Sequence, residues 1–228
     1  MGKQSPQGIC SLCGARKTKG AMRGHLQNCA AAHDAPKGNT SRVFQIRVHG
    51  RHDPVFWVDV EVKRDAKLRA MDDFLRRLWL ECCGHLSAFH IDGVTYPVIV
   101  DREYGFRRDE RSMNYRIGDV LHGPGHRFAY EYDFGSTTEL VFQVWGWRDG
   151  VLGRSPVRLL ARNEVPAWPC KVCGRPATLV CVHCRYEGNP FYCADHTSAD
   201  DPEHEEAFLP VVNSPRMGVC GYTGEVES

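Results

Sequence analysis

The sequence predicts an α+β fold, in which a central mixed β-sheet packs against one main helix, with small zinc-binding modules at both ends. Stretches of alternating hydrophobic residues, typical of strands, surround a single long stretch with helical spacing. Most of the eleven cysteines lie near the two ends of the chain. Turn-rich stretches at 35–41 and 163–169 separate the three parts. We therefore expect three domains, the head (1–34), the central domain (42–162) and the tail (168–228).

In the central domain, the alternation of hydrophobic residues over 42–48 and 55–62 predicts two half-buried strands. Apolar residues then recur at helical spacing over 65–83, which predicts the main helix, and Gly84 ends it. Cys82 and Cys83 fall at this helix end, where we interpret them as packing residues.

The rest of the central domain reads as short strands. Asp92-Gly93 predicts a hairpin turn between strands at 88–91 and 94–100. The polar stretch 101–114 is interpreted as a loop. A helical turn and three further strands complete the expected order, at 115–121, 126–133, 139–147 and 157–160.

The cysteines predict metal sites. An odd number of cysteines without a secretory signal argues against a disulfide framework, and C-x2-C pairs followed by histidines favour thiolate metal sites in a reducing compartment. Tetrahedral zinc is the expected metal, with iron as an alternative for sulfur-rich sites. We expect two to three zinc ions per chain.

The head has the spacing C-x2-C-x11-H-x3-C, formed by Cys10, Cys13, His25 and Cys29. The last two ligands are four residues apart, so they share one face of a helix and converge on one ion. This pattern resembles a C2HC variant of the small zinc finger. His33, four residues further on, is an alternative to Cys29.

Basic side chains lie between the second and third ligands of the head. Folding around zinc would gather them on a small surface, which predicts contacts with DNA or RNA. The alternatives are that these charges are simply solvated, or that the finger docks on a protein. The residues are Arg16, Lys17, Lys19 and Arg23.

The tail carries four Cys/His pairs, a spacing that favours a cross-brace in which alternate pairs share an ion. This looks like the broad treble-clef and B-box or MYND-like group. A simpler alternative is one four-cysteine knuckle from the two C-x2-C pairs. The two expected cross-brace sets are Cys170, Cys173, Cys193 and His196, and Cys181, Cys184, His204 and Cys220.

Length, composition and charge narrow the function. With 228 residues, 42% hydrophobic and 25% charged, the chain has ordinary proportions for a soluble globular protein. Its apolar stretches are too short to cross a bilayer, and its N-terminus has no apolar signal core, so we expect a cytoplasmic protein without membrane contact. Residues 1–42 carry seven basic and one acidic side chain, while 199–228 carry seven acidic and one basic. The basic end favours a polyanionic partner.

Several segments resemble the Ri-plasmid ORF-three-like family, also known as the passenger "TnpR-like" protein of bacterial insertion elements. They are the helix 65–83, G-H-L-S-A-F-H-I-D-G at 84–93, I-G-D-V-L at 117–121 and Y-E-Y-D-F-G at 130–135. The resemblance covers roughly 42–150. It implies one helix against a mixed, β-grasp-like sheet, a bacterial or archaeal origin and a link with plasmids and mobile elements, but no established activity.

The chain also departs from that family. Many members continue after Tyr-Asp-Phe-Gly with Asp and then Trp-Glu-His, whereas residues 136–140 here are S-T-T-E-L, so any role of those residues is not carried over. His85 falls where members commonly have a histidine, and we interpret it as structural. Asp133 is expected to cap the turn before Gly135.

No spacing of a known catalytic site is visible, so we expect a binding protein rather than an enzyme. The expected function is that of a zinc-binding accessory protein of a bacterial or mobile-element system, which contacts nucleic acid through the basic head. A protein–protein adaptor is one alternative. Another is an enzyme of unrecognised type, with a pocket around His85, Tyr104, Asp133 and the 101–114 loop.

Overall fold

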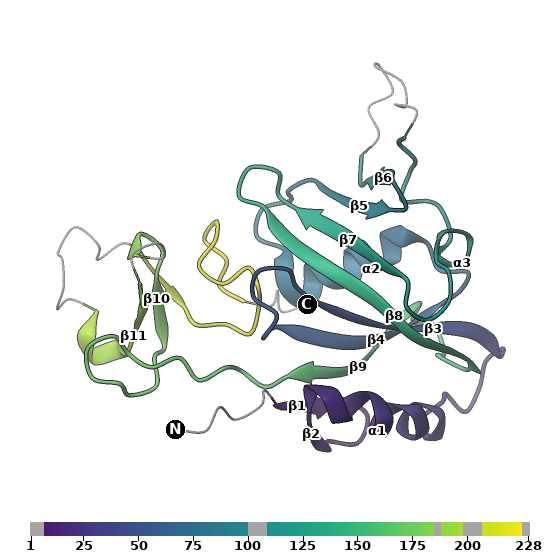
Figure 1. Ribbon diagram of the computed structural model, residues 1–228, viewed down its shortest axis with the longest axis horizontal. Coiled ribbons are helices and arrows are strands. Elements are labelled where there is room, and N and C mark those ends of the chain that lie inside the picture. The colour runs from purple at the N-terminus through teal and green to yellow at the C-terminus, as the bar shows by residue number, and fades with distance from the viewer. Residues whose placement is uncertain (1–6, 100–108, 185–187, 198–206, 225–228) are drawn as a thin grey trace. The chain divides into compact units, whose positions relative to one another are not determined.

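The computed structural model of the chain is shown in Figure 1. It describes residues 7–99, 109–184, 188–197 and 207–224. The chain forms two compact units, and each is described by itself. Unit 1 consists of Met1–Leu75 and Leu86–Glu164, and unit 2 of Arg76–His85 and Val165–Ser228.

Unit 1 is built on one nine-stranded sheet with the order β2-β1-β9-β4-β3-β8-β7-β5-β6. Every pairing between its named strands is antiparallel. The strands are β1 (Gln7–Cys10), β2 (Arg16–Thr18), β3 (Ser41–Gly50), β4 (Trp57–Lys63), β5 (Ser87–Ile91), β6 (Val94–Pro97), β7 (Arg127–Tyr132), β8 (Thr138–Gly150) and β9 (Val157–Asn163).

The predicted fold class, a mixed sheet with one main helix, is therefore wrong. The sheet is antiparallel, and the described helices of unit 1 are short: α1 (Lys19–Ala32), α2 (Leu68–Leu75) and α3 (Ile117–Val120). The longest of them belongs to the head. Strand β1 pairs with β9 and with β2, so the head extends the sheet that we had assigned to the central stretch alone.

The helix expected over 65–83 is shorter than predicted. Helix α2 covers only eight residues and is followed by η1 (Arg76–Leu80), a π-helical turn. Trp79 and Leu80 of this turn are buried, so the apolar spacing continues after the α-helix has ended. Cys82 and Cys83 follow the helical segment instead of lying in it.

Most local predictions of strands and turns are confirmed. Strands β3 and β4 cover the two alternating stretches, and Asp92 and Gly93 connect β5 to β6. Both turn residues have positive φ, 50° and 78°, as a two-residue type I′ hairpin turn requires.

One face of the sheet in unit 1 is apolar and packs against α2. Phe128 of β7 stacks on Phe142 of β8, with ring centroids 4.6 Å apart. Tyr130 of β7 is fully buried and donates a hydrogen bond of 2.6 Å to Asp72 of α2, which places that helix over this face. Ser87 donates to the same carboxylate, also at 2.6 Å.

The other face carries a buried polar ladder between β3 and β4. Gln45 lies opposite Glu61 and donates to it at 3.1 Å, while Arg47 lies opposite Asp59 and donates twice, at 2.9 and 2.6 Å. Helix α1 covers this face, because Arg47 also donates to the carbonyl of Lys19 at the helix start. The ladder is buried because the head packs over it.

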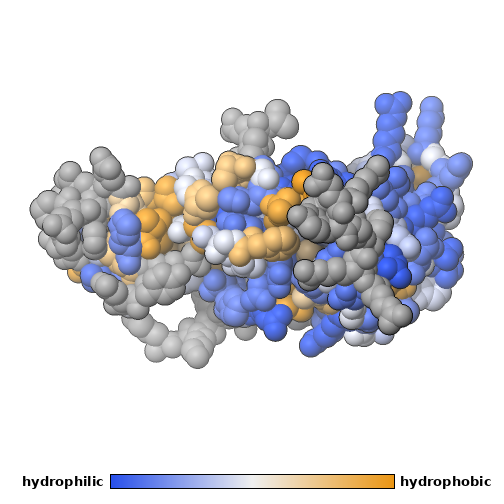
Figure 2. All heavy atoms as spheres, turned by 90° about the horizontal axis from the view of Figure 1, so that it is seen from above, coloured by the Kyte–Doolittle hydropathy of each residue, from blue (hydrophilic) through white to orange (hydrophobic). Residues whose placement is uncertain are grey.

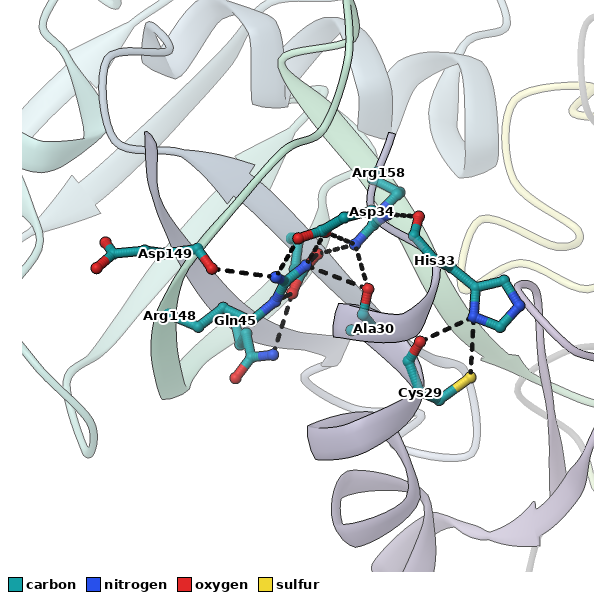
Figure 3. A network of polar contacts seen from close by, with 9 residues as sticks. Cys29, Ala30, His33, Asp34, Gln45, Arg148, Asp149 and Arg158 are labelled. Atoms are coloured by element: carbon teal, nitrogen blue, oxygen red, sulfur yellow. Dashed lines mark hydrogen bonds and ion pairs between the residues drawn. The ribbon is translucent and has the colours of Figure 1, made fainter. Parts of the chain in front are cut away.

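Two arginines hold the C-terminal end of α1, as Figure 3 shows. Arg148 of β8 donates to Glu61 at 2.6 Å and to both carboxylate oxygens of Asp34, at 2.6 and 2.9 Å. Arg158 of β9 donates to Glu61 and to the carbonyl of His33. These guanidinium groups satisfy carbonyls that have no partner within a helix and complement the negative end of its dipole. The contacts with Arg148 lower the pKa of Asp34.

Unit 2 contains a three-stranded antiparallel sheet with the order β11-β10-β12. The strands are β10 (Leu179–Cys181), β11 (Phe191–Tyr192) and β12 (Phe208–Pro210), and a 3-10 turn, η3 (Ala194–His196), follows β11. A small core packs on it, formed by Cys181, Cys184, Tyr192 and Ala207.

The surface in Figure 2 mixes hydrophobic and hydrophilic side chains. In the part of the chain that the structure describes, the exposed large hydrophobic residues are Leu86, Ile99, Tyr115, Phe134, Trp147, Val165 and Val172. Among the described residues, none of the helices combines the length and the apolar character that crossing a membrane takes.

Candidate metal centres

The head brings its four predicted ligands together. Cys10, Cys13, His25 and Cys29 have ligand atoms that all lie within 4.8 Å of one another. The sulfurs of Cys10 and Cys29 are 3.8 Å apart, and Cys13 Sγ is 3.3 Å from His25 Nε2. A tetrahedral zinc ion would place two sulfurs about 3.8 Å apart and a sulfur and a nitrogen about 3.5 Å apart. The head therefore has the spacing of a tetrahedral site.

A tight turn and a capped helix build this arrangement. Gly14 donates to the carbonyl of Cys10 at 2.9 Å, and Gly14 has a φ of 76°, a conformation that favours glycine. Thr18 caps α1 by accepting from the backbone N–H of Ala21. The helix then presents His25 and Cys29 one turn apart on the same face.

His33, the alternative to Cys29, lies at the end of α1. Its Nδ1 is 2.8 Å from the carbonyl oxygen of Cys29 and 3.7 Å from the sulfur of the same residue (Figure 3). His33 is outside the four-ligand group, whereas Cys29 belongs to it. The histidine therefore supports the helix end beside the ligand.

The tail brings together the first predicted set, Cys170, Cys173, Cys193 and His196. The sulfurs of Cys173 and Cys193 are 3.8 Å apart, and His196 Nδ1 is 3.7 Å from Cys170 Sγ and 3.1 Å from Cys193 Sγ. These distances again approach the edges of a zinc tetrahedron.

The tail repeats the turn of the head. Gly174 donates to the carbonyl of Cys170 at 2.9 Å and has a φ of 71°. Desolvation works to raise the pKa of the Cys170 thiol, but backbone N–H groups, first that of Cys173 and then that of Cys193, lower it to about 6. Arg175 donates to Cys173 Sγ at 3.4 Å. The turn thus favours the thiolate, which is the form that binds metal.

The second predicted tail set is not assembled in the described residues. Cys181 and Cys184 are joined by a disulfide. His204 lies outside the described residues. Cys220 lies instead with Cys82, Cys83 and His85. The described residues therefore do not bring Cys220 together with Cys181 and Cys184, and the full set with His204 stays a prediction.

A further group, missed by sequence reasoning, consists of Cys82, Cys83, His85 and Cys220, all in unit 2. From the sequence, packing is expected for the two adjacent cysteines and a structural role for His85. A signal for this group is the Cys-Gly dipeptide. It occurs four times, at 13–14, 83–84, 173–174 and 220–221, and so marks the turns of all three groups of three cysteines and one histidine.

A group of a different composition lies in unit 1, where Asp92 at the β5–β6 turn meets His122 and His126. Nε2 of His122 lies 2.9 Å from one carboxylate oxygen of Asp92, and Nε2 of His126 lies 3.1 Å from the other. The side chains of Asp92 and His122 are half or more exposed. Hydrogen bonding between these groups accounts for the arrangement without a metal.

The four basic residues predicted to contact nucleic acid differ in how free they are. The Arg16 side chain is 69% exposed although it pairs with Glu164, and Lys17 is exposed. The other two, Lys19 and Arg23, make hydrogen bonds within the protein. Lys19 Nζ donates to the carbonyl of Pro54 and Arg23 donates to Gln143. Burial, followed by the charge of Arg47, lowers the pKa of Lys19 to about 8.

The pocket expected for an enzyme, around His85, Tyr104, Asp133 and the 101–114 loop, stays a prediction. Tyr104 and most of this loop lie outside the described residues. Asp133 has a local role, because its Oδ1 accepts from the backbone N–H groups of Gly135 and Ser136. This confirms the predicted turn cap.

Comparisons with known proteins give a match to one family model and partial similarity to solved structures. The family model described as plasmid pRiA4b ORF-3-like protein matches residues 41–172. A solved structure from Methanosarcina mazei Go1, the protein of unknown function MM3350, is similar over 54% of this chain and 68% of that one. Its sequence identity is 11% and its TM-score 0.43. No curated protein matches the chain.

Proposed function

Because the chain belongs to the plasmid pRiA4b ORF-3-like family and carries Cys/His groups at both ends of the matched region, we propose that it is a zinc-binding accessory protein. The head and the tail each hold one structural Zn²⁺. The thiolate ligands of both groups need reduced cysteines, so the proposal places the protein in the cytoplasm, although Cys181 and Cys184 are joined in the structure.

The observation that carries the proposal is the repeated geometry of the two groups. Both contain three cysteines and one histidine, both start with the same Cys-x2-Cys-Gly turn, and both have ligand spacings close to the edges of a tetrahedron. Four side chains fill all positions of a tetrahedral ion, which leaves no position for a reacting water. The ions therefore stabilise the fold.

Elemental analysis tests this proposal. Protein purified without added metal is expected to contain zinc, and Cys13→Ser and Cys173→Ser are each expected to lower the count by one ion per chain. Cys181→Ser/Cys184→Ser serves as the matched control, because these cysteines lie outside both groups. An unchanged zinc content in Cys13→Ser or Cys173→Ser, or iron in place of zinc, would contradict the proposal.

The second candidate function is nucleic-acid binding through the head. It is favoured by Arg16 and Lys17, which are adjacent and exposed on β2, beside a helix whose exposed positions include the polar Gln27 and Asn28. Lys19 and Arg23 make internal contacts, so the proposal counts two cations instead of four: Lys17, and Arg16 if phosphate displaces its pairing with Glu164.

The salt dependence of binding tests this second candidate. With two phosphates neutralised, the logarithm of the binding constant is expected to fall against the logarithm of the salt concentration with a slope of about −2 on duplex DNA. Arg16→Ala/Lys17→Ala should flatten the slope, whereas Lys19→Ala/Arg23→Ala should leave it unchanged. If the intact protein binds neither DNA nor RNA at low salt, a protein partner replaces nucleic acid in the proposal.

A further inference from the structure

We infer that Cys82, Cys83, His85 and Cys220 hold a third structural zinc ion, within unit 2. The sulfur of Cys83 is 3.6 Å from that of Cys82 and 3.7 Å from that of Cys220. His85 Nε2 lies 2.9 Å from Cys83 Sγ and 3.2 Å from Cys220 Sγ. Both sulfur–sulfur distances lie close to the edge of about 3.8 Å of a tetrahedral zinc site, and both sulfur–nitrogen distances are shorter than its edge of about 3.5 Å.

One backbone feature of the head and the tail recurs at these ligands, a glycine of positive φ directly after a cysteine. Gly84 follows Cys83 with a φ of 77°, and Gly221 follows Cys220 with a φ of 66°. A Cβ at either glycine would meet nothing within 4 Å, so the left-handed conformation, and not lack of space, favours glycine there. Cys220 itself has a φ of 50°, which is uncommon for a residue with a side chain.

The charge around the group suits an anionic metal site. Three thiolates and one Zn²⁺ leave one net negative charge, which needs a cation when it is partly buried. Arg216 is fully buried and donates to Cys82 Sγ at 3.5 Å. Arg175 stands in the same relation to Cys173 in the tail site.

The segments that carry the ligands are positioned by further hydrogen bonds. Ser214 donates to the carbonyl of Trp79 in the π-helical turn at 2.6 Å, and accepts from the backbone N–H of Arg216 at 2.9 Å. Arg76 donates to the carbonyl of His85 at 2.8 Å. π-Helices occur mostly as single turns within α-helices, and such turns are frequent at functional sites. Here the turn lies just before the ligands.

The proposed ion joins parts of the chain that are far apart in sequence. His85 and Cys220 are 135 residues apart, so the ion closes a long loop. Closing such a loop removes many conformations from the unfolded chain. The zinc would therefore fix the C-terminal segment to the segment that follows the π-helical turn.

Zinc stoichiometry tests the inference independently of the first two sites. We expect three zinc ions per chain in the intact protein and two in Cys83→Ser, in Cys220→Ser and in His85→Ala. His85→Cys should keep three, because a thiolate can replace the imidazole. Cys181→Ser/Cys184→Ser should also keep three.

The zinc counts of these variants distinguish the proposed ligands from the set expected from sequence, in which Cys220 joins Cys181 and Cys184. If Cys181→Ser/Cys184→Ser loses the ion and Cys83→Ser keeps it, Cys220 belongs to the cross-brace expected from sequence and the inference is overturned. Loss of zinc from Cys13→Ser and Cys173→Ser is a separate result, so failure of the third site leaves the head and tail sites standing.

Cysteine alkylation of the intact protein tests the inference without any variant that could fail to fold. Cys83 and Cys220 are expected to resist alkylation until zinc is chelated, and then to react together, as fast as in unfolded protein. If they react at that rate while zinc is bound, the inference is overturned. It is equally overturned if they stay protected after chelation and react only after reduction, because they then form a disulfide.

Discussion

Chelation of zinc from the intact protein is expected to abolish the amide protection of α1 and β1. Zinc contributes about 10–16 kcal/mol of apparent binding free energy to finger peptides at neutral pH. That is as large as the whole unfolding free energy of a typical domain, about 5–15 kcal/mol. Hydrogen exchange followed by mass spectrometry measures the loss of amide protection in each segment.

The loss is expected to spread beyond the head, because the head shares a core with the sheet. Met22 and Leu26 of α1 pack in one cluster with Trp57, Leu160 and Ala161. Amides of β9 should therefore lose protection with α1, while β7 and the part of β8 paired with it keep theirs.

Cys13→Ser should reproduce this pattern without a chelator and leave the tail protected. The expectation fails if α1 keeps its amide protection once the head zinc has been removed, since the helix would then be stable through its packing alone.

Glu61→Ala is expected to lower the free energy of unfolding by up to about 3–5 kcal/mol, the cost of removing one partner from a buried ion-pair network. Glu61 is fully buried and accepts hydrogen bonds from Gln45, Arg148 and Arg158. Its loss would remove one of the two carboxylates that Arg148 and Arg158 share near the end of α1, and Asp34 would remain as their partner. Urea unfolding followed by circular dichroism measures the change.

Asp149→Ala is the matched control, because Asp149 pairs with Arg42 on the surface, where both side chains are well exposed. Such pairs contribute up to about 1 kcal/mol. Equal destabilisation by the two substitutions would show that the buried network does not hold the helix end.

The strands were predictable from sequence, but the extent of the sheet was not. Alternation in 42–48 marks one apolar face, and it appears as β3. The alternate residues Gln45 and Arg47 are also buried, because α1 covers them. Alternation says which residues share a face, whereas the partner that covers the face comes from a distant segment. Nothing local in 157–160 indicates that this strand lies between β1 and β4.

A Cys/His group was predictable from sequence where its members lie close together along the chain. The head spacing places all ligands within twenty residues, so a turn and a helix suffice to bring them together. Cys83 and Cys220 are brought together by the fold, and their spacing carries no signal. The helical periodicity was misleading at the same place, because Trp79 and Leu80 remain buried in a π-helical turn.

The pairing of β1 with β9 has a consequence for aggregation. Without the head, β9 would become an edge strand with free backbone groups, which is a template for pairing with another chain. With the head folded, the edge is β2, a three-residue strand that carries Arg16 and Lys17, and short, charged edges resist such pairing. A cell short of zinc would then hold this protein in a form whose sheet is open to a second copy.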